Sequence, residues 1–368
     1  MRTSRALAVL AAGALTIGVA ACGSSNNSST STSGSSSSSK VNATLDGAGS
    51  TFAAPIYQQV GANVKGNGLT VNYQPVGSGA GVAQFAAGTT DYAGSDPALT
   101  SDDMKSIKKG TPIQIPFAFG AITASYNLSG VKSGIKLDGK TLADIYLGKV
   151  KKWDDPEITS QNPGMNLPST NITVVHRSDS SGTTKGFTGF LQAYSSEWKS
   201  KVGSDKDVKW PTGTGAKGNS GVAAAVKQTD GAIGYVEQAY ALQNGFTFAS
   251  VKNKAGKYIA PTLQSTTAAG KGITVPPNLG ISVIDSPNPS AYPITSQTFA
   301  ITYKDPCKAG FSKSVASGLK SFLDYLLGSS GQQTIQKLSY APIPSTLKSD
   351  SQKAVNGMQC NGAAIAGS

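Results

Sequence analysis

Three loops built of small residues precede segments with a helical pattern, and together they could bind an oxyanion. They are 47–55 (Gly-Ala-Gly-Ser-Thr-Phe-Ala-Ala-Pro), 77–82 (Gly-Ser-Gly-Ala-Gly-Val) and 177–184 (Arg-Ser-Asp-Ser-Ser-Gly-Thr-Thr). A helix N-terminus presents free N–H groups and a partial positive charge, and small residues let an anion approach them. Ordinary helix capping explains one such loop equally well. Three loops with the same chemistry favour an anion site.

Two charged residues narrow the choice of anion. Arg177 opens the third loop and supplies a positive charge with a planar fork of donors. Asp96, within Ala-Gly-Ser-Asp-Pro at 93–97, would repel an anion that carries no proton. Phosphate near neutral pH keeps a proton that an ionised carboxylate can accept, whereas sulfate does not. The pair therefore favours phosphate over sulfate.

The residues that catalytic and metal sites require are sparse. His176 is the only histidine, and because it follows an apolar strand pattern we expect it to pack beside a sheet. A metal site needs clustered His, Cys, Asp or Glu. The acidic pairs at 102–103 and 154–155 are typical of helix starts or turns. We therefore expect neither an enzyme nor a metal or cofactor.

One segment matches the phosphate-binding loop of nucleotide hydrolases, with Gly134, Gly139, Lys140 and Thr141 at the required spacing. The residues between the glycines are bulky, and 135 and 137 alternate like a short strand. Thr141 as a helix cap accounts for the end of the motif. A nucleotide site is therefore not expected.

The N-terminus has the pattern of an export signal. Arg2 and Arg5 precede an apolar stretch at 6–21, which is shorter than the roughly 20 residues of a membrane span. Residues 1–21 are therefore predicted to be a signal peptide. The small residues before Cys22 resemble a lipobox, so we expect Cys22 to carry lipid such as palmitate; an ordinary signal peptide with an incidental cysteine is the alternative. Residues 22–40 form a Ser-rich tether with nothing apolar to bury.

The net charge bears on the binding partners of the protein, and the remaining two cysteines bear on its cellular compartment. The net charge is +12, but the basic residues are scattered, so nucleic acid is not an expected partner. Cys307 and Cys360 form an even pair in an exported body, where such pairs are usually bridged. We expect a disulfide that pins the C-terminal tail.

Strand and helix patterns alternate from 41 to 368, which predicts an α/β fold, and the length favours two lobes. The chain should cross between them within 117–120 and again near 292–293. Expected strands are 69–73, 91–94, 113–119, 121–126, 171–175, 232–236, 281–284 and 298–303, and expected helices are 82–87, 141–147, 182–194, 222–228 and 315–327.

Several longer stretches resemble the phosphate-binding proteins of bacterial phosphate ABC transporters, the PstS family of type II periplasmic binding proteins. These stretches are 46–52, 71–74, 137–142, 145–149, 152–155, 231–237 and 293–296. The resemblance implies two α/β lobes joined by two hinge strands, with the ligand cleft between them. Lobe I would comprise 41–118 and 292–368, and lobe II 119–291. The segment 258–288 departs from the family pattern.

The resemblance also implies a function and a set of ligand residues. The chain would be a monomeric lipoprotein on the extracytoplasmic face of the bacterial cell membrane, and it would deliver inorganic phosphate to the permease subunits of an ABC importer. Another oxyanion, an extracellular phosphatase and an adhesin-like envelope protein are the alternatives. Asp179 would orient Arg177, and Asp96 would accept the phosphate proton. Carried over by position, the ligand residues are Thr51, Phe52 (through its backbone N–H), Ser78, Asp96, Arg177, Asp179, Ser181, Gly182 and Thr183.

Overall fold

The computed structural model describes residues 41–132 and 134–365, and a mixed, curled sheet of ten strands forms its centre. Strands β9 (Thr247–Phe248) and β13 (Ala341–Pro342) pair with β4 beside the main path of this sheet. The main path runs β2 (Leu69–Gln74), β1 (Ala43–Gly49), β3 (Tyr92–Ser95), β12 (Thr295–Tyr303), β4 (Pro112–Asn127), β8 (Ala232–Glu237), β6 (Thr173–Arg177) and β7 (Thr214–Ala216).

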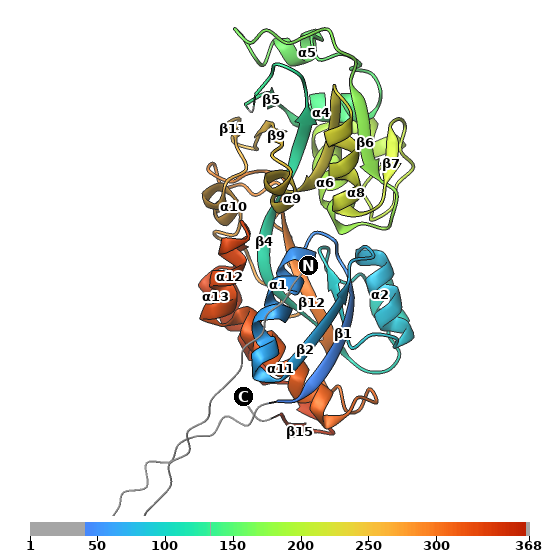
Figure 1. Ribbon diagram of the computed structural model, residues 1–368, viewed down its shortest axis with the longest axis vertical. Coiled ribbons are helices and arrows are strands. Elements are labelled where there is room, and N and C mark those ends of the chain that lie inside the picture. The colour runs from blue at the N-terminus through green and yellow to red at the C-terminus, as the bar shows by residue number, and fades with distance from the viewer. Residues whose placement is uncertain (1–40, 133, 366–368) are drawn as a thin grey trace, which may run out of the picture. The chain divides into compact units, whose positions relative to one another are not determined.

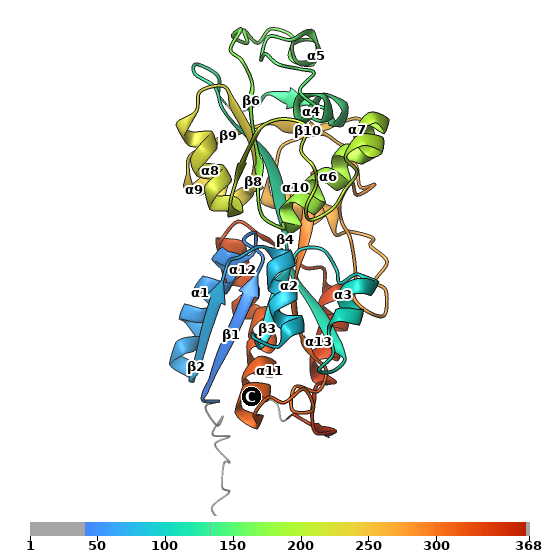
Figure 2. The same cartoon turned by 90° about the vertical axis from the view of Figure 1, so that its right-hand side faces the viewer.

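Strand β4 lies in the middle of this sheet, and the two halves of the sheet share it (Figures 1 and 2). From Pro112 to Ala121 it pairs antiparallel with β12, and from Ile122 onward it pairs with β8. We call the part built on β1, β2 and β3 lobe I, and the part built on β6, β7 and β8 lobe II. The two predicted segments 113–119 and 121–126 are therefore one unbroken strand that belongs to both lobes, as a hinge strand must.

Lobe I is completed by helices whose apolar faces lie on the sheet. The predicted helix 315–327 is confirmed as α11, in which Leu319, Phe322, Leu323 and Leu326 form a buried apolar stripe and Val315 is half-buried. Full burial of each such side chain stabilises the fold by about 1.5–3 kcal/mol. The helices of this lobe are α1 (Ala54–Val64), η1 (Lys65–Asn67), α2 (Ser78–Ala87), α3 (Ser101–Ser106), α11 (Lys313–Leu327), α12 (Ser329–Lys337) and α13 (Ser345–Asn356).

In lobe II, the predicted helix 182–194 is confirmed at both ends as α6. The cap expected at Thr141 is wrong: Asp138 caps α4, and its carboxylate accepts a hydrogen bond from the Thr141 N–H at 2.8 Å. Asp is a stronger N-cap here because its oxygen reaches the third residue of the helix. The helices are α4 (Gly139–Tyr146), α5 (Pro156–Thr159), α6 (Gly182–Tyr194), α7 (Ser196–Lys201), α8 (Gly218–Gln228), α9 (Gln238–Gln243) and α10 (Leu263–Ala269), beside a small sheet of β11 (Tyr258–Ile259), β10 (Ser250–Lys252) and β5 (Lys136–Leu137).

The predicted strand 281–284 is wrong, because this segment is irregular. Leu279 and Asp285, which flank it, have φ angles of 57° and 53°, outside the range that a strand allows. A side chain replaces the hydrogen bond of a neighbouring strand at one position: the Val283 N–H donates to the side-chain Oε1 of Gln297 at 3.2 Å. The apolar run predicted the burial correctly but not the conformation.

A disulfide joins Cys307 to Cys360, as predicted, with a Cα–Cα distance of 4.8 Å. Asp305 adds to this anchor, since its carboxylate accepts hydrogen bonds from the N–H groups of Asn361 and Gly362 at 2.9 and 2.8 Å. The bridge fixes the terminal hairpin of β14 (Gln359–Cys360) and β15 (Ala363–Ala364) to the segment after β12.

The predicted signal peptide, Cys22 and the tether lie outside the described residues. Within the described part of the chain, no helix combines the length and apolar character that crossing a bilayer requires.

Candidate functional site

The three small-residue loops meet at the junction of the lobes. The Gly79 N–H in lobe I donates to the Ser180 carbonyl in lobe II at 3.1 Å. A Cβ added at Gly182, the first residue of α6, would lie 2.4 Å from Asp96 Oδ2 and 2.6 Å from Ser78 Oγ. Only glycine permits this approach. Figure 2 shows α2 and α6 on opposite sides of the junction, so the starts of these helices belong to one site.

Each loop adopts the helix start that its residues predict. Pro55 lies in the first turn of α1, and Gly77 caps α2 with a φ of 98° that only glycine adopts readily. The Ser181 hydroxyl caps α6 by accepting a hydrogen bond from the Thr184 N–H at 3.1 Å. The first N–H groups of each helix have no intrahelical partner. These starts therefore offer donors at the junction.

Arg177 lies at the end of β6 with a side chain that is only 1% exposed. Its Nε donates to Asp179 Oδ1 at 2.7 Å, and a second guanidinium nitrogen bonds the other carboxylate oxygen. Burial alone would raise the pKa of Asp179, but the Arg177 hydrogen bonds and charge, with the Gly218 N–H, hold it below its usual value. Asp179 thus fixes the orientation of a permanently charged, buried guanidinium.

Asp96 is a buried acceptor on the lobe I side, 1% exposed. Its Oδ1 accepts hydrogen bonds from Ser50 Oγ at 2.6 Å and Thr298 Oγ1 at 2.9 Å, and its Oδ2 lies 3.4 Å from Ser78 Oγ. Burial raises the pKa of Asp96 to about 6, against the opposing effect of these hydroxyls and of the Arg177 charge. The carboxylate is therefore ionised at neutral pH but protonates under mildly acidic conditions.

Two hydroxyl groups in the site are forced to act as donors. Thr51 Oγ1 accepts from both the N–H and the side-chain amide of Asn219, at 3.2 and 2.8 Å. Thr183 Oγ1 accepts from Arg177 and from the same amide, each at 3.2 Å. A hydroxyl has two lone pairs and one proton. Because these contacts occupy both lone pairs, each proton is left for a further acceptor.

Phe52 contributes its backbone, since its side chain is fully buried in the core. The Tyr240 hydroxyl of lobe II donates to the Thr51 carbonyl at 2.7 Å. In a trans peptide the C=O and the following N–H point in opposite directions. The bond from Tyr240 therefore fixes the direction of the Phe52 N–H.

All nine predicted ligand residues lie in this one region, but the sequence reasoning missed Asn219. It is fully buried and is the second residue of α8, the fourth helix that starts at the junction. The signal was available, because 213–218 (Gly-Thr-Gly-Ala-Lys-Gly) is another small-residue loop before a helical pattern. Ser50 and Thr298 were also missed, and Thr298 carries no signal because it lies within a strand.

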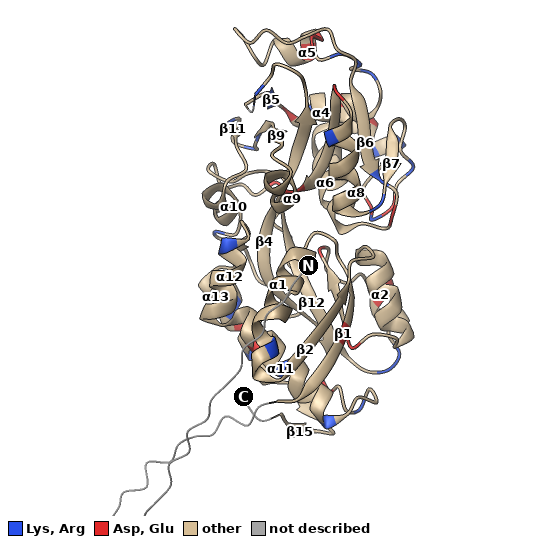
Figure 3. Ribbon diagram, viewed as in Figure 1, with Lys and Arg blue, Asp and Glu red and all other residues tan. Residues whose placement is uncertain are grey.

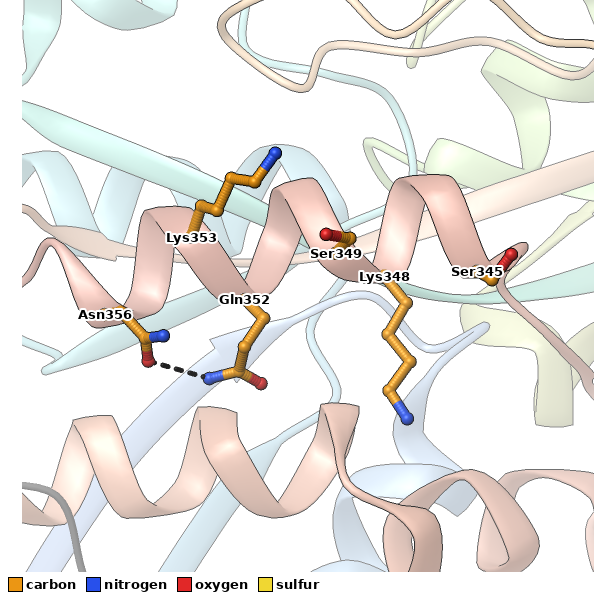
Figure 4. Close-up of a pocket in the computed structure, with 6 residues that line it drawn as sticks. All are labelled: Ser345, Lys348, Ser349, Gln352, Lys353 and Asn356. Carbon is orange, nitrogen blue, oxygen red and sulfur yellow. Dashed lines mark hydrogen bonds between the residues drawn. The ribbon is translucent and has the colours of Figure 1, made fainter.

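Hollows are also found next to this site and away from it. One of about 490 Å³ adjoins the site at Pro97 and Gly182 and extends along α6. Another of about 410 Å³ follows the exposed side of α13, where Lys348 and Lys353 project from the helix and Gln352 bonds Asn356 at 3.0 Å (Figure 4). None of the predicted ligand residues lines the second hollow.

The lone histidine packs beside the sheet, as expected. The His176 ring stacks on Trp210 beside the sheet, with centroids 4.7 Å apart. In the described part of the chain no three His, Cys, Asp or Glu side chains are grouped as a metal site would require. Among the described residues, Lys and Arg occur on many different elements of both lobes (Figure 3).

The chain resembles known proteins over most of its length. Residues 33–330 match the PBP superfamily domain. The phosphate-binding protein PstS of Haemophilus influenzae is 42% identical, over 83% of this chain and 92% of that protein. Phosphate-binding protein PstS3 of Mycobacterium bovis is 36% identical, over 97% of this chain and 99% of that protein.

Solved structures share the fold. A phosphate-binding protein from Stenotrophomonas maltophilia superposes with a TM-score of 0.67 at 20% identity, over 88% of this chain and 99% of that one. At this identity the likeness supports the two-lobed architecture alone.

Proposed function

The chain belongs to the PstS family of phosphate-binding proteins, and we propose that it captures inorganic phosphate at the junction of its lobes for an ABC importer. It is a binding protein and not an enzyme, and it uses no cofactor. In this proposal phosphate contacts the backbone N–H of Phe52, the helix starts at Ser78 and Gly182, and the guanidinium of Arg177. The remaining contacts are the hydroxyls of Thr51, Ser181 and Thr183 and the carboxylate of Asp96, with Asp179 orienting Arg177.

The main support for the proposal is that the site offers hydrogen-bond donors at several residues and an acceptor at Asp96. Thr51 and Thr183 have only their protons left to offer, and the buried Arg177 adds a charge with further donors. Asp96 faces these donors from lobe I, is buried, and forms no ion pair with a described residue. A tetrahedral anion with one proton matches this arrangement, because it accepts at three oxygens and donates at the fourth.

The first test is titration calorimetry with phosphate and with sulfate. Because the pKa of Asp96 is about 6, only about a tenth of the molecules keep the proton of this carboxyl group at neutral pH, so sulfate should bind at least about tenfold more weakly than phosphate there. Arg177→Ala should abolish measurable phosphate binding, because it leaves the anion without a countercharge and Asp179 without its partner. Lys353→Ala, which removes a charge whose side chain is 74% exposed on α13, is the matched control and should bind as the wild type does.

Phosphate binding by Arg177→Ala within about tenfold of the wild type would contradict the site. Sulfate binding as tight as phosphate binding at neutral pH would contradict the proposed ligand.

The proposed cellular location of the protein is inferred from the sequence that precedes the described residues. A lipidated Cys22 would tether the binding protein to the extracytoplasmic face of the membrane, beside the permease subunits to which it delivers phosphate as a monomer. Cys22→Ala should then move the protein from the membrane fraction to the soluble fraction without changing its phosphate affinity. An unchanged membrane-bound amount would refute the anchor alone.

A further inference from the structure

Glu237, the last residue of β8, has a fully buried side chain at the junction of the lobes. Its Oε2 accepts a hydrogen bond from the Ala239 N–H at 2.8 Å and lies 2.8 Å from the Tyr340 hydroxyl. The same hydroxyl lies 2.6 Å from the Phe52 carbonyl. A chain of contacts therefore runs from lobe II through Tyr340 to a backbone group of the proposed phosphate site.

The number of protons available for these contacts determines the protonation state of Glu237. Tyr340 has one hydroxyl proton, and the Phe52 carbonyl can only accept. The 2.6 Å contact therefore takes the proton of Tyr340. The contact from Tyr340 to Oε2 is then a hydrogen bond only if Oε2 donates, which requires Glu237 to be a carboxylic acid. With an ionised Glu237, one of the two contacts would place two acceptors against each other in a dry interior.

The surroundings of the Glu237 side chain favour its neutral, protonated form. Its Oε1 is buried and has no hydrogen-bond partner, and among the described residues no lysine or arginine forms an ion pair with it. Asp96, Tyr240 and Tyr340 interact with it electrostatically, and none of these three is a cation. Burial raises the pKa of Glu237 well above its usual value, and the Asp96 charge raises it further. An unpaired buried carboxylate would be costly.

We propose that Glu237 is held as a neutral carboxylic acid and positions the Phe52 peptide for phosphate through Tyr340. The inference rests on the proposed function and adds a positioning residue to it. Tyr240 holds the Thr51 carbonyl and Tyr340 holds the next one, so the peptide units on both sides of Phe52 are fixed. One oxygen of Glu237 must accept from Ala239 and donate to Tyr340. A carboxylic acid does both, whereas a carboxylate or an amide does not.

The protonation state can be measured without phosphate. An infrared difference spectrum of wild type minus Glu237→Gln, taken at neutral pH, should show the carbonyl band of a protonated carboxylic acid. Asp96 is ionised under these conditions and cancels in the difference. A difference spectrum with only carboxylate bands would overturn the proposal. Because this readout needs no ligand, it stands or fails independently of phosphate binding.

The positioning role is tested with Tyr340→Phe, which removes one hydroxyl. We expect about tenfold weaker phosphate binding, and Glu237→Gln should weaken it similarly. The double variant should lose no more than about as much as either single variant, since both break one chain of contacts. Tyr303→Phe is the matched control, because the Tyr303 hydroxyl is buried without a partner. Full affinity in Tyr340→Phe, or additive losses in the double variant, would overturn the role of Glu237.

These results also separate the two proposals. A wild-type protein that does not bind phosphate at all contradicts the proposed function. A wild-type protein that binds phosphate while Tyr340→Phe and Tyr303→Phe bind equally well contradicts only the inference about Glu237.

Discussion

Asn219 donates two hydrogen bonds to the Thr51 hydroxyl, although the two residues lie 168 positions apart in the chain and belong to different lobes. The side-chain amide of Asn219 also bonds Thr183, and its carbonyl oxygen accepts from the Glu237 N–H at 2.9 Å. One buried side chain thus joins the lobes and sets the direction of two hydroxyl protons. Ligand binding and lobe closure are coupled where a contact exists only in the closed arrangement.

Asn219→Ala should therefore weaken phosphate binding by roughly tenfold to a hundredfold, because it removes the side-chain bonds to Thr51 and Thr183 and leaves each hydroxyl a free lone pair, although the backbone N–H of residue 219 still reaches Thr51. The loss should appear mainly as faster dissociation, measured by stopped-flow fluorescence. Asn63→Ala is the matched control, since the Asn63 amide bonds Tyr325 and Thr334 within lobe I. If both variants retain wild-type dissociation rates, Asn219 does not hold the lobes together.

Lys206 should act as a second, salt-sensitive link. Its backbone carbonyl accepts from the Ser181 N–H at 2.8 Å, and its Nζ lies 3.3 Å from Asp103 Oδ1 in lobe I. Lys206→Met should weaken phosphate binding by about twofold to tenfold at low ionic strength, and the difference should shrink as salt is added. Asp103 is less suitable for this test because it also caps α3.

Lys105→Met is the control for this link, because the Lys105–Asp102 pair is exposed and lies within α3. Equal salt dependence of phosphate affinity in the wild type, Lys206→Met and Lys105→Met would show that the Lys206–Asp103 pair does not stabilise the closed arrangement.

The disulfide should matter for stability and not for binding. Cys307 and Cys360 are 53 residues apart, and closing a loop of this length stabilises the fold by about 4 kcal/mol in the chain-entropy model. The double Ser variant should lower the free energy of unfolding by up to about that amount, while phosphate affinity stays unchanged. Urea unfolding and calorimetry measure the two quantities. A large loss of affinity with unaltered stability would contradict this separation.

The sequence was sufficient to predict the helix starts that meet at the junction, because their chemistry is local. Small residues before a helix leave N–H groups open, and Ser181 and Gly77 do cap α6 and α2. The lobe II helix 182–194 and the α11 stripe were predictable from their apolar spacing alone. These features depend on neighbours in the chain.

What the sequence could not supply depends on contacts between distant segments. Thr298 lies in a buried strand, and only the antiparallel pairing of β12 with β3 brings its hydroxyl to Asp96. Tyr340 and Glu237 are 103 residues apart, so no local pattern indicates their shared proton. The segment 281–284 was mistaken for a strand because apolar residues are buried in irregular segments too, where a side chain such as Gln297 satisfies the backbone.

Sulfate binding should increase as the pH falls through the pKa of Asp96. Burial raises that pKa to about 6, so the side chain keeps its proton below this pH and loses it above. An ionised Asp96 faces sulfate with two acceptors and no proton between them, whereas protonated Asp96 donates to it. Sulfate affinity should therefore be low at neutral pH, rise by up to about tenfold as the pH falls from neutrality to the pKa, and level off below it.

Asp96→Asn decides whether this carboxyl group is responsible, because its amide can donate to sulfate at any pH. The variant should bind sulfate more tightly than the wild type at neutral pH, and its sulfate affinity should hardly change with pH. Calorimetry in buffers of different ionisation enthalpy adds a second readout: at neutral pH the wild type should take up close to one proton per sulfate bound, and the variant none. A wild type whose sulfate affinity is flat across this range, or a variant with the same pH dependence as the wild type, would show that Asp96 does not sense the ligand's proton.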